Sequence, residues 1–121
     1  MKRNMDLVRK ILLVLEEHEH GFAPKKLQIE GHSNEEVAFH VHLMGEAGLL
    51  EVYDDTSFDG TSPEAIPAHI TWNGYEFLDA ARSPSIWEAA KQRIVSEGLG
   101  LSFEVLKGLL TALTNKEVGL T

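Results

Sequence analysis

The chain has no cysteine among its 121 residues. Disulfide bonds, a thiol nucleophile and thiolate metal ligands are therefore excluded, and the absence agrees with a reducing compartment, so we expect a cytoplasmic protein. Long apolar runs are also missing. The amino-terminal run from Ile11 to Leu15 is short and flanked by charged residues, which argues against a secretory signal or a membrane span.

Positive charge is missing from almost half of the chain. No lysine or arginine occurs from Leu27 to Ala81, and this stretch holds eleven of the nineteen acidic residues, within a net charge of -8. A protein that binds duplex DNA must neutralise phosphates with cations. The charge therefore disfavours nucleic acid and anionic lipid as partners, except through a local basic patch.

Motifs of catalysis are absent as well. There is no Gly-rich phosphate loop, no nucleophile elbow and no paired histidine motif of the metalloprotease kind. His18 and His20, and His40 and His42, form two His-x-His pairs. In a helix the second pair would lie about 200° apart around the axis, which hinders binding of one ion. We expect no enzymatic activity, no metal site and no cofactor.

The acidic segment holds four histidines, which could become cationic below about pH 6 and offset part of its charge. They are His32, His40, His42 and His69.

Helical spacing of apolar residues predicts a first helix from a cap at Asn4 to about Glu19, ended by Gly21 and apolar on more than one face. Residues 27–29 are predicted as a short strand. Only this strand and a turn lie before the next helix.

Ser33 gives the clearest helix start, because Glu36 three residues later completes a capping box worth about 1 kcal/mol. This helix is predicted to run to Ala47 and to end at a left-handed Gly48. Its inward residues should be Val37, Val41 and Met44.

A hairpin is predicted next, with strands at 49–53 and 68–71 and a long polar turn at 54–67. Thr71 should cap a third helix that ends near Arg82 and buries Trp72, Tyr75 and either Phe77 or Leu78.

Two further helices are predicted from their caps. Ser85 with Glu88 forms a second capping box, with Ile86, Ala90 and Ile94 on one side of that helix, and Ser102 caps the last helix. An apolar stripe follows in that helix, formed by Leu106, Leu109, Leu110 and Leu113. The fold class is therefore α+β, mostly α, in a single domain 1–121. Its core is 1–82, and helices in 83–121 are expected to pack on that core.

Two segments resemble bacterial winged-helix regulators. Residues 37–50, VAFHVHLMGEAGLL, resemble a recognition helix running into a wing strand, and residues 70–78, ITWNGYEFL, resemble a second wing strand running into a Thr-capped helix. With the amino-terminal helix and the Ser-Phe-Glu-Val-Leu-Lys tail, nearly the whole chain is similar to domain-of-unknown-function family 2513. That resemblance implies a winged-helix-like fold and frequent phage or prophage origin among bacterial proteins, and it leaves the activity open. The usual supporting helix of a helix-turn-helix is missing or much reduced.

The outward face of the Ser33 helix carries Phe39 and Leu43 where a DNA reader would carry polar or cationic side chains. Covering both would contribute roughly 3 to 5 kcal/mol. Either the chain's own carboxy-terminal helices or a partner chain would cover them.

The predicted wing has only acidic charges, Asp54, Asp55, Asp59 and Glu64. It would repel phosphate. A solvated acidic loop and a mimic of nucleic acid that binds a basic protein both remain open.

Six cations form the only basic patch that could meet phosphate: Lys2, Arg3, Arg9, Lys10, Lys25 and Lys26. The alternative is an ion-paired helix surface, with Asp6 beside Arg9 or Lys10.

We therefore expect a small winged-helix-like protein that acts through contacts with a protein partner or in a homodimer. The candidate interface is the pair Phe39 and Leu43, or the leucine stripe of the last helix. A DNA-binding regulator that uses the basic patch is the alternative, and an acidic mimic of nucleic acid is a minor one.

Overall fold

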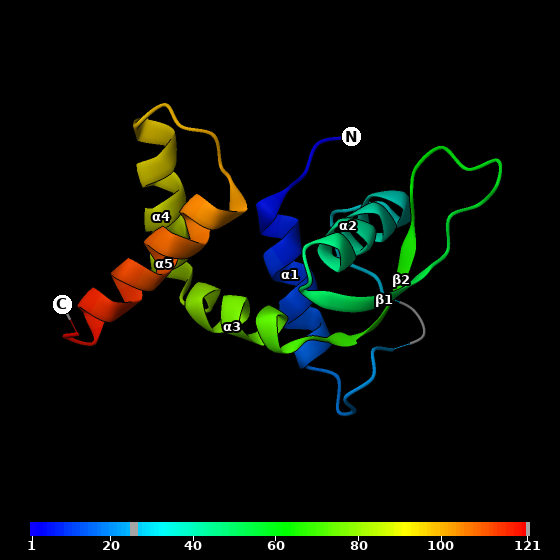
Figure 1. Ribbon diagram of the computed structural model, residues 1–121, viewed down its shortest axis with the longest axis horizontal. Helices are drawn as coiled ribbons and strands as arrows, with labels where there is room; N and C mark the ends of the chain where they lie inside the picture. The colour runs from blue at the N-terminus through cyan, green and yellow to red at the C-terminus, as the bar shows by residue number, and fades with distance from the viewer. Residues whose placement is uncertain (25–26, 121) are drawn as a thin grey trace. The chain divides into compact units, whose positions relative to one another are not determined.

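The computed structural model describes residues 1–24 and 27–120. Within these ranges the chain forms five helices and one antiparallel two-stranded hairpin, which makes it a mostly helical α+β protein (Figure 1). In chain order the elements are α1 (Met5–Glu16), α2 (Asn34–Glu46), β1 (Leu50–Asp54), β2 (Ala65–Ile70), α3 (Trp72–Ala81), α4 (Pro84–Ser96) and α5 (Phe103–Glu117). No helix in the described ranges has the length and apolar character needed to cross a membrane.

The chain divides into two compact units, Met1–Tyr75 and Glu76–Thr121. The boundary falls inside α3, ahead of the division after Arg82 that the sequence suggested. That residues 83–121 pack on residues 1–82 stays a prediction.

Helix α1 begins as predicted, because the Asn4 side chain accepts a hydrogen bond from the Leu7 backbone N–H at 3.2 Å. It ends at Glu16, so the prediction of an end near Glu19 and Gly21 was wrong. Beyond Leu15 the sequence is charged and polar up to Gly21, so another helical turn would have no apolar side chain to bury.

Helix α2 packs against α1 and against both strands, with Val37, Val41 and Met44 buried as predicted. The Ser33 Oγ accepts from the Glu36 N–H at 3.1 Å, which confirms the cap. Gly48 has the expected left-handed backbone, with φ of 76°.

The hairpin pairs Leu50 with Ile70 and Asp54 with Ala65, with a bulge after Glu51. Its second strand begins three residues earlier than predicted, because backbone pairing extends past Pro67 toward the wing loop. Figure 1 shows this loop, residues 55–64, extending beyond the strands; we call it the wing after the sequence prediction.

The predicted strand at 27–29 was wrong, since these residues form no strand. The chain instead contacts the sheet earlier, where the Ala23 N–H donates to the Ala68 carbonyl at 2.8 Å. This segment is therefore joined to β2 by a backbone hydrogen bond at Ala23 rather than by a strand at 27–29.

Helix α3 starts in a close contact with the turn before β1. Thr71 Oγ1 accepts from the Gly74 N–H at 3.0 Å and donates to the Gly48 carbonyl, which confirms the cap. A Cβ on Gly74 would lie 2.1 Å from the Leu49 carbonyl oxygen, so only glycine fits here. This contact fixes the first turn of α3 against the base of the hairpin.

The burial predicted for α3 was half correct. Phe77 and Leu78 are fully buried, but Trp72 is 78% exposed and Tyr75 is also exposed. Trp72 and Tyr75 lie in the first turn of the helix and Phe77 and Leu78 in the second, so the apolar character of the first turn was a poor guide to burial.

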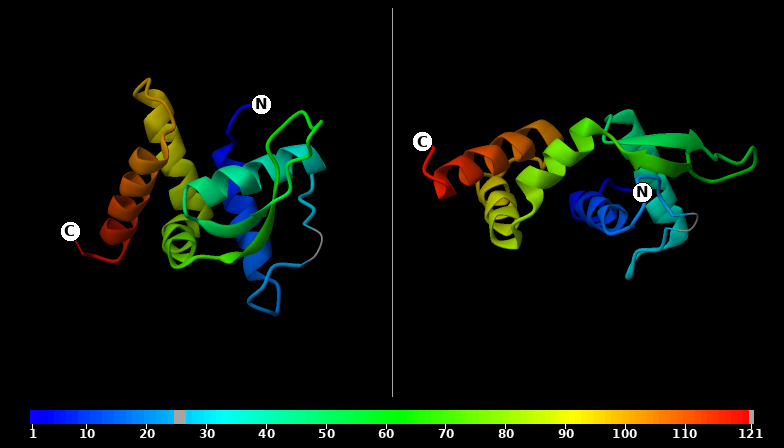
Figure 2. Two further views of the ribbon diagram at one scale, coloured as in Figure 1. Left: turned by 45° about the vertical axis from the view of Figure 1, so that its right-hand side comes forward. Right: turned by 90° about the horizontal axis from the view of Figure 1, so that it is seen from below.

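The second unit contains α4 and α5, which lie side by side (Figure 2). The cap of α4 is Ser83, whose Oγ accepts from the Ile86 N–H at 3.2 Å, so the prediction of a cap at Ser85 was wrong. Pro84 takes the first helical position, where its missing N–H costs nothing. Ala90 and Ile94 are buried as expected, whereas Ile86 is half-buried.

Ser102 caps α5 as predicted, accepting from the Val105 N–H at 3.2 Å. The Phe77 ring lies 4.9 Å from the Phe103 ring and 6.3 Å, edge-on, from the Trp87 ring, measured between centroids. These aromatic contacts join α3, α4 and α5 within the second unit.

Candidate interaction surface

The outward side of α2 carries no cation. Phe39 and Leu43 are half-buried, and the Phe39 ring stands edge-on to the His40 ring at 5.8 Å. His42 and Glu46, one turn apart, approach within 3.7 Å. The predicted apolar pair is thus partly open to solvent, on a helix without lysine or arginine.

His40 is fully buried and is not a solvated histidine of the acidic segment. Its Nε2 accepts from the Asn4 N–H at 2.8 Å, and its Nδ1 lies 2.8 Å from the Glu36 carbonyl oxygen. A carbonyl only accepts, so Nδ1 donates to it. Unlike a solvated histidine, His40 is thus held through both ring nitrogens by backbone groups.

The wing is held against the first turn of α2 by Glu35. Its Oε1 accepts from Thr61 Oγ1 at 2.6 Å and from Ser62 Oγ at 2.8 Å. These two hydrogen bonds, that from Thr61 first, hold the pKa of the Glu35 carboxyl below its ordinary value. We call this arrangement the Glu35 latch.

The base of the wing is ordered by Thr56. Its N–H donates to Asp54 Oδ1 at 3.0 Å and lowers the pKa of that carboxyl, and its hydroxyl donates to the Glu64 carbonyl. The wing therefore combines acidic side chains with an internally hydrogen-bonded loop.

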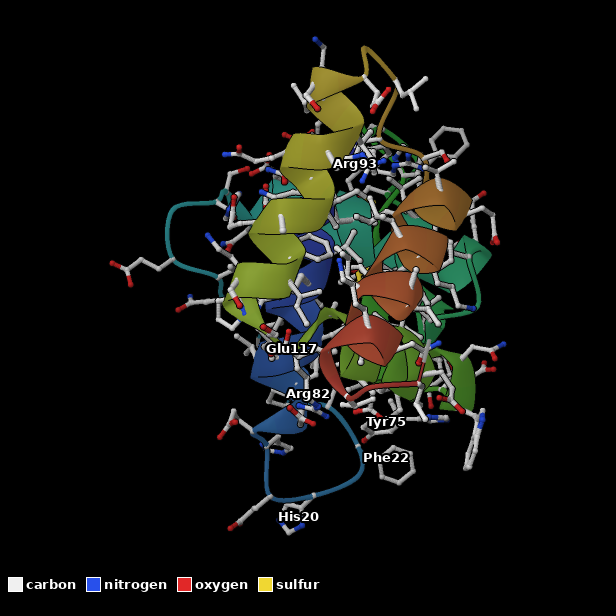
Figure 3. All side chains as sticks on the ribbon, turned by 90° about the vertical axis from the view of Figure 1, so that its left-hand side faces the viewer. His20, Phe22, Tyr75, Arg82, Arg93 and Glu117 are labelled. Atoms are coloured by element: carbon white, nitrogen blue, oxygen red, sulfur yellow. The ribbon has the colours of Figure 1, made fainter. Side chains whose placement is uncertain are left out.

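A shallow hollow of about 440 Å³ opens on the surface of the first unit. It is lined by Gly21, Phe22, His69, Ile70 and Tyr75. Phe22 is 70% exposed, and its ring lies edge-on to the His69 ring at 6.4 Å. Figure 3 shows Phe22 beside Tyr75.

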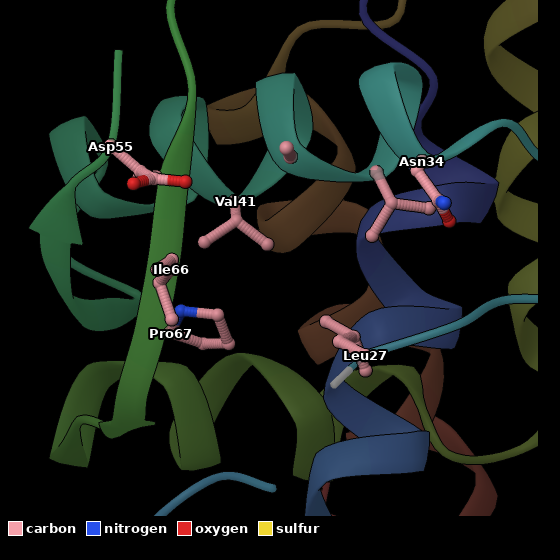
Figure 4. A pocket seen from close by; sticks show the side chains of 9 residues that line it. Leu27, Asn34, Val41, Asp55, Ile66 and Pro67 are labelled. Atoms are coloured by element: carbon pink, nitrogen blue, oxygen red, sulfur yellow. The ribbon is translucent and has the colours of Figure 1, made fainter. Parts of the chain in front are cut away.

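A second hollow, which we call the α2–β2 cleft, has a volume of about 260 Å³. Figure 4 shows Val41 of α2 facing Pro67 of β2 across it, with Leu27, Asn34, Asp55 and Ile66 also around it. The sequence analysis missed both this cleft and the Glu35 latch. No local pattern indicates either, since each joins residues far apart in the chain.

Only part of the leucine stripe of α5 lies on the surface. Leu106 and Leu110 are both 0% exposed and have no surface to offer a partner, while Leu109 and Leu113 are half-buried. The stripe predicts the buried side of the helix better than it predicts a docking surface.

The basic patch lies partly on α1 and partly on the segment before it. Lys2, Arg3 and Lys10 are exposed and Arg9 is half-buried. Arg3, Asp6 and Arg9 each have an interaction partner. The predicted members Lys25 and Lys26 lie outside the described residues.

Metal-ligating side chains do not gather in the described part of the chain. No group of three or more histidine, aspartate or glutamate side chains is placed there to hold an ion. His18 and His20 lie with their rings edge-on at 5.6 Å, just after α1.

Comparison with known proteins identifies the family. The model of the family described as hypothetical protein (DUF2513) matches residues 2–100. An uncharacterized protein of Haemophilus influenzae is 38% identical over 110 residues, which cover 88% of this chain and 90% of that relative. No solved structure matches the chain. The family model and this bacterial relative together show that the chain belongs to the DUF2513 family.

Proposed function

We propose that this protein is a winged-helix-like module that acts through contacts with another protein, without catalysis and without a cofactor. The order of helix, helix and hairpin, followed by a Thr-capped helix, supports the winged-helix likeness. In this comparison α2 takes the place of the recognition helix and residues 55–64 take the place of the wing.

The observation that carries the proposal is the chemistry of those two elements. Neither has a lysine or arginine, and the wing loop and the adjoining strand end hold Asp54, Asp55, Asp59 and Glu64. The first turn of α2, where backbone N–H groups favour an anion such as phosphate, carries Glu35 and Glu36. A DNA duplex would meet carboxylates at both places.

Exposed apolar side chains support a protein partner. Phe22, Tyr53, Phe58 and Trp72 are all largely exposed in the first unit. Aromatic residues are enriched in the buried centres of protein interfaces, where they contribute most of the binding energy. On the outward side of the hairpin, Tyr53 pairs with Ile66, which is also exposed.

Titration of a labelled DNA duplex tests the proposal. We expect no binding tighter than about micromolar at physiological salt. Submicromolar binding with a steep salt dependence, lost when Lys2, Arg3 and Lys10 are replaced by glutamine, would instead establish the alternative, a DNA-binding regulator that uses the basic patch.

Affinity purification from the native host tests the positive side. A partner recovered with the wild-type protein should be lost with the Phe22→Ser, Trp72→Ser double variant. It should be retained with Val95→Ser, a control at an exposed apolar residue of α4. Equal recovery with both variants would count against the exposed aromatic residues as the interface.

Two other assemblies have distinct outcomes. Light scattering that gives a dimer mass would establish the homodimer. A partner that is itself a nucleic-acid-binding protein, displaced by DNA, would favour the acidic mimic.

A further inference from the structure

The α2–β2 cleft has an apolar interior. Val37 and Val41 of α2 and Pro67 of β2 are buried, and Ile66 lies at the rim with much of its side chain exposed. Figure 4 shows Val41 and Pro67 facing each other across the space between the helix and the strand. An apolar group that entered would exchange water for these side chains on several sides.

Two polar residues, Asp55 and Asn34, also line the cleft. Asp55 marks one side, where its backbone N–H donates to the Glu64 carbonyl at 2.9 Å and fixes the loop, and Asn34 begins α2 on the other. Every charged side chain of the wing is acidic. The entrance therefore favours a cation over an anion.

The volume limits what can enter. Pockets for drug-sized ligands and cofactors span about 300 to 1,000 Å³, whereas this cleft measures about 260 Å³. It suits one large apolar side chain, as in the anchor pockets of protein interfaces.

The Glu35 latch joins the same two structural parts that form the cleft. Glu35 follows Asn34 in the first turn of α2, and its carboxylate holds Thr61 and Ser62 of the loop between β1 and β2. The cleft is thus held in shape before a ligand arrives, which lowers the entropic cost of binding.

We propose that the α2–β2 cleft is an anchor site for a partner chain, which inserts one large apolar side chain and places an adjacent lysine or arginine at Asp55. This inference rests on the proposed protein-binding function and names the partner's chemistry: an apolar residue with a basic residue next to it.

Nuclear magnetic resonance titration with a capped dipeptide tests the proposal. The probe is N-acetyl-phenylalanyl-lysine amide, compared with N-acetyl-phenylalanyl-glutamate amide. We expect saturable shifts at the amides of residues 34–41 and 65–67 with the lysine probe, and affinity lower by about two- to fivefold or more with the glutamate probe.

Three variants sharpen the test. Ala38→Trp, at a half-buried residue of α2 that lines the cleft, should fill the space and abolish the shifts. Ala89→Trp, at an exposed alanine of α4, is its control and should bind like the wild type. Asp55→Asn should reduce the preference for the lysine probe by about two- to fivefold.

The Asp55→Asn variant also has a matched control. Asp59→Asn, in the same exposed loop but away from the cleft lining, should leave the preference for lysine unchanged. If Asp59→Asn and Asp55→Asn acted alike, the loop's overall charge rather than Asp55 would set the preference, and the proposal would be overturned.

Other results would overturn it directly. These are no saturable shift up to about 10 mM probe, shifts centred on Phe22 and Tyr75, or equal affinity for the two probes. Self-association that Ala38→Trp abolishes would identify a second copy of the chain as the occupant. The DNA titration tests the protein-binding proposal separately. If the cleft binds neither probe and the protein does not bind DNA, only the anchor-site proposal fails, and the exposed aromatic residues remain the candidate interface.

Discussion

Replacing the buried His40 should lower the stability of the first unit by more than a substitution on the surface of α2 would. His40→Ala leaves the Asn4 N–H without its acceptor, and an unsatisfied buried donor costs about 1 to 3 kcal/mol. The bond from Nδ1 to the Glu36 carbonyl is lost too, for about 0.5 to 1.5 kcal/mol. The free energy of unfolding should therefore fall by about 2 to 4 kcal/mol.

Urea denaturation followed through the amide signals of α1 and α2 measures this loss within the first unit. His40→Phe keeps a ring of similar shape without nitrogens, so it should retain the packing but still lose about 1 to 3 kcal/mol. His42→Ala, two residues after His40 in the same helix and partly exposed, should change the free energy of unfolding by no more than about 0.5 kcal/mol.

The ring tautomer provides an independent check. Nitrogen chemical shifts should place the proton of His40 on Nδ1, because Nε2 accepts from the Asn4 N–H. A proton on Nε2, or equal losses for His40→Ala and His42→Ala, would refute the reasoning.

Three further predictions concern local contacts. Gly74→Ala should lower the thermal midpoint, at a cost of about 1 to 3 kcal/mol, because the added methyl group meets the Leu49 carbonyl; an unchanged midpoint would contradict that close approach. The Glu35 pKa is lowered in the folded protein, so the latch contributes stability above the unfolded pKa of this group and loses it as pH falls through the folded value. Amide exchange in residues 55–64 should therefore speed up in acid relative to the intrinsic rate, and Glu35→Ala should remove that pH dependence; a dependence that persists in the variant would have another source. Ser83→Ala should cost about 1 kcal/mol in a denaturation assay and Ser85→Ala only about a few tenths, whereas the reverse order would restore the cap predicted from sequence.

Helix starts were predictable because a cap is a local event. Asn4, Ser33, Thr71 and Ser102 each accept a backbone N–H three residues later, and that chemistry is visible in a window of four residues. The cap of α4 was predicted at Ser85 because Glu88 stands three residues later. The cap is Ser83 instead, because Pro84 fits the first helical position.

The second half of the capping box shows where local reasoning stops. Glu36 was expected to bond back to the Ser33 backbone, but its Oε1 lies 2.6 Å from His32 Nδ1. A neighbouring imidazole therefore competes for the carboxylate, and the sequence pattern alone does not rank the two partners.

The interaction surface was less predictable because it is made of long-range contacts. The Glu35 latch joins residues 26 and 27 positions apart, and the α2–β2 cleft combines side chains from Leu27 to Pro67. Burial was also ambiguous. Phe77 and Trp72 are both apolar, yet Phe77 is buried and Trp72 is exposed. Hydrophobicity alone does not specify which side of a helix another element covers.

The charge of the wing and its hydrogen bonds to α2 favour a cationic partner over DNA. To contact a duplex as a winged helix does, the wing and the start of α2 would have to face phosphates together. Here they are bonded to each other through Glu35, which uses Thr61 and Ser62 as donors. If those two hydroxyls were released to bind a phosphate, the Glu35 carboxylate would lose its donors and face the same phosphate. A cationic partner imposes no such conflict, because it can approach Asp55 and leave the latch closed.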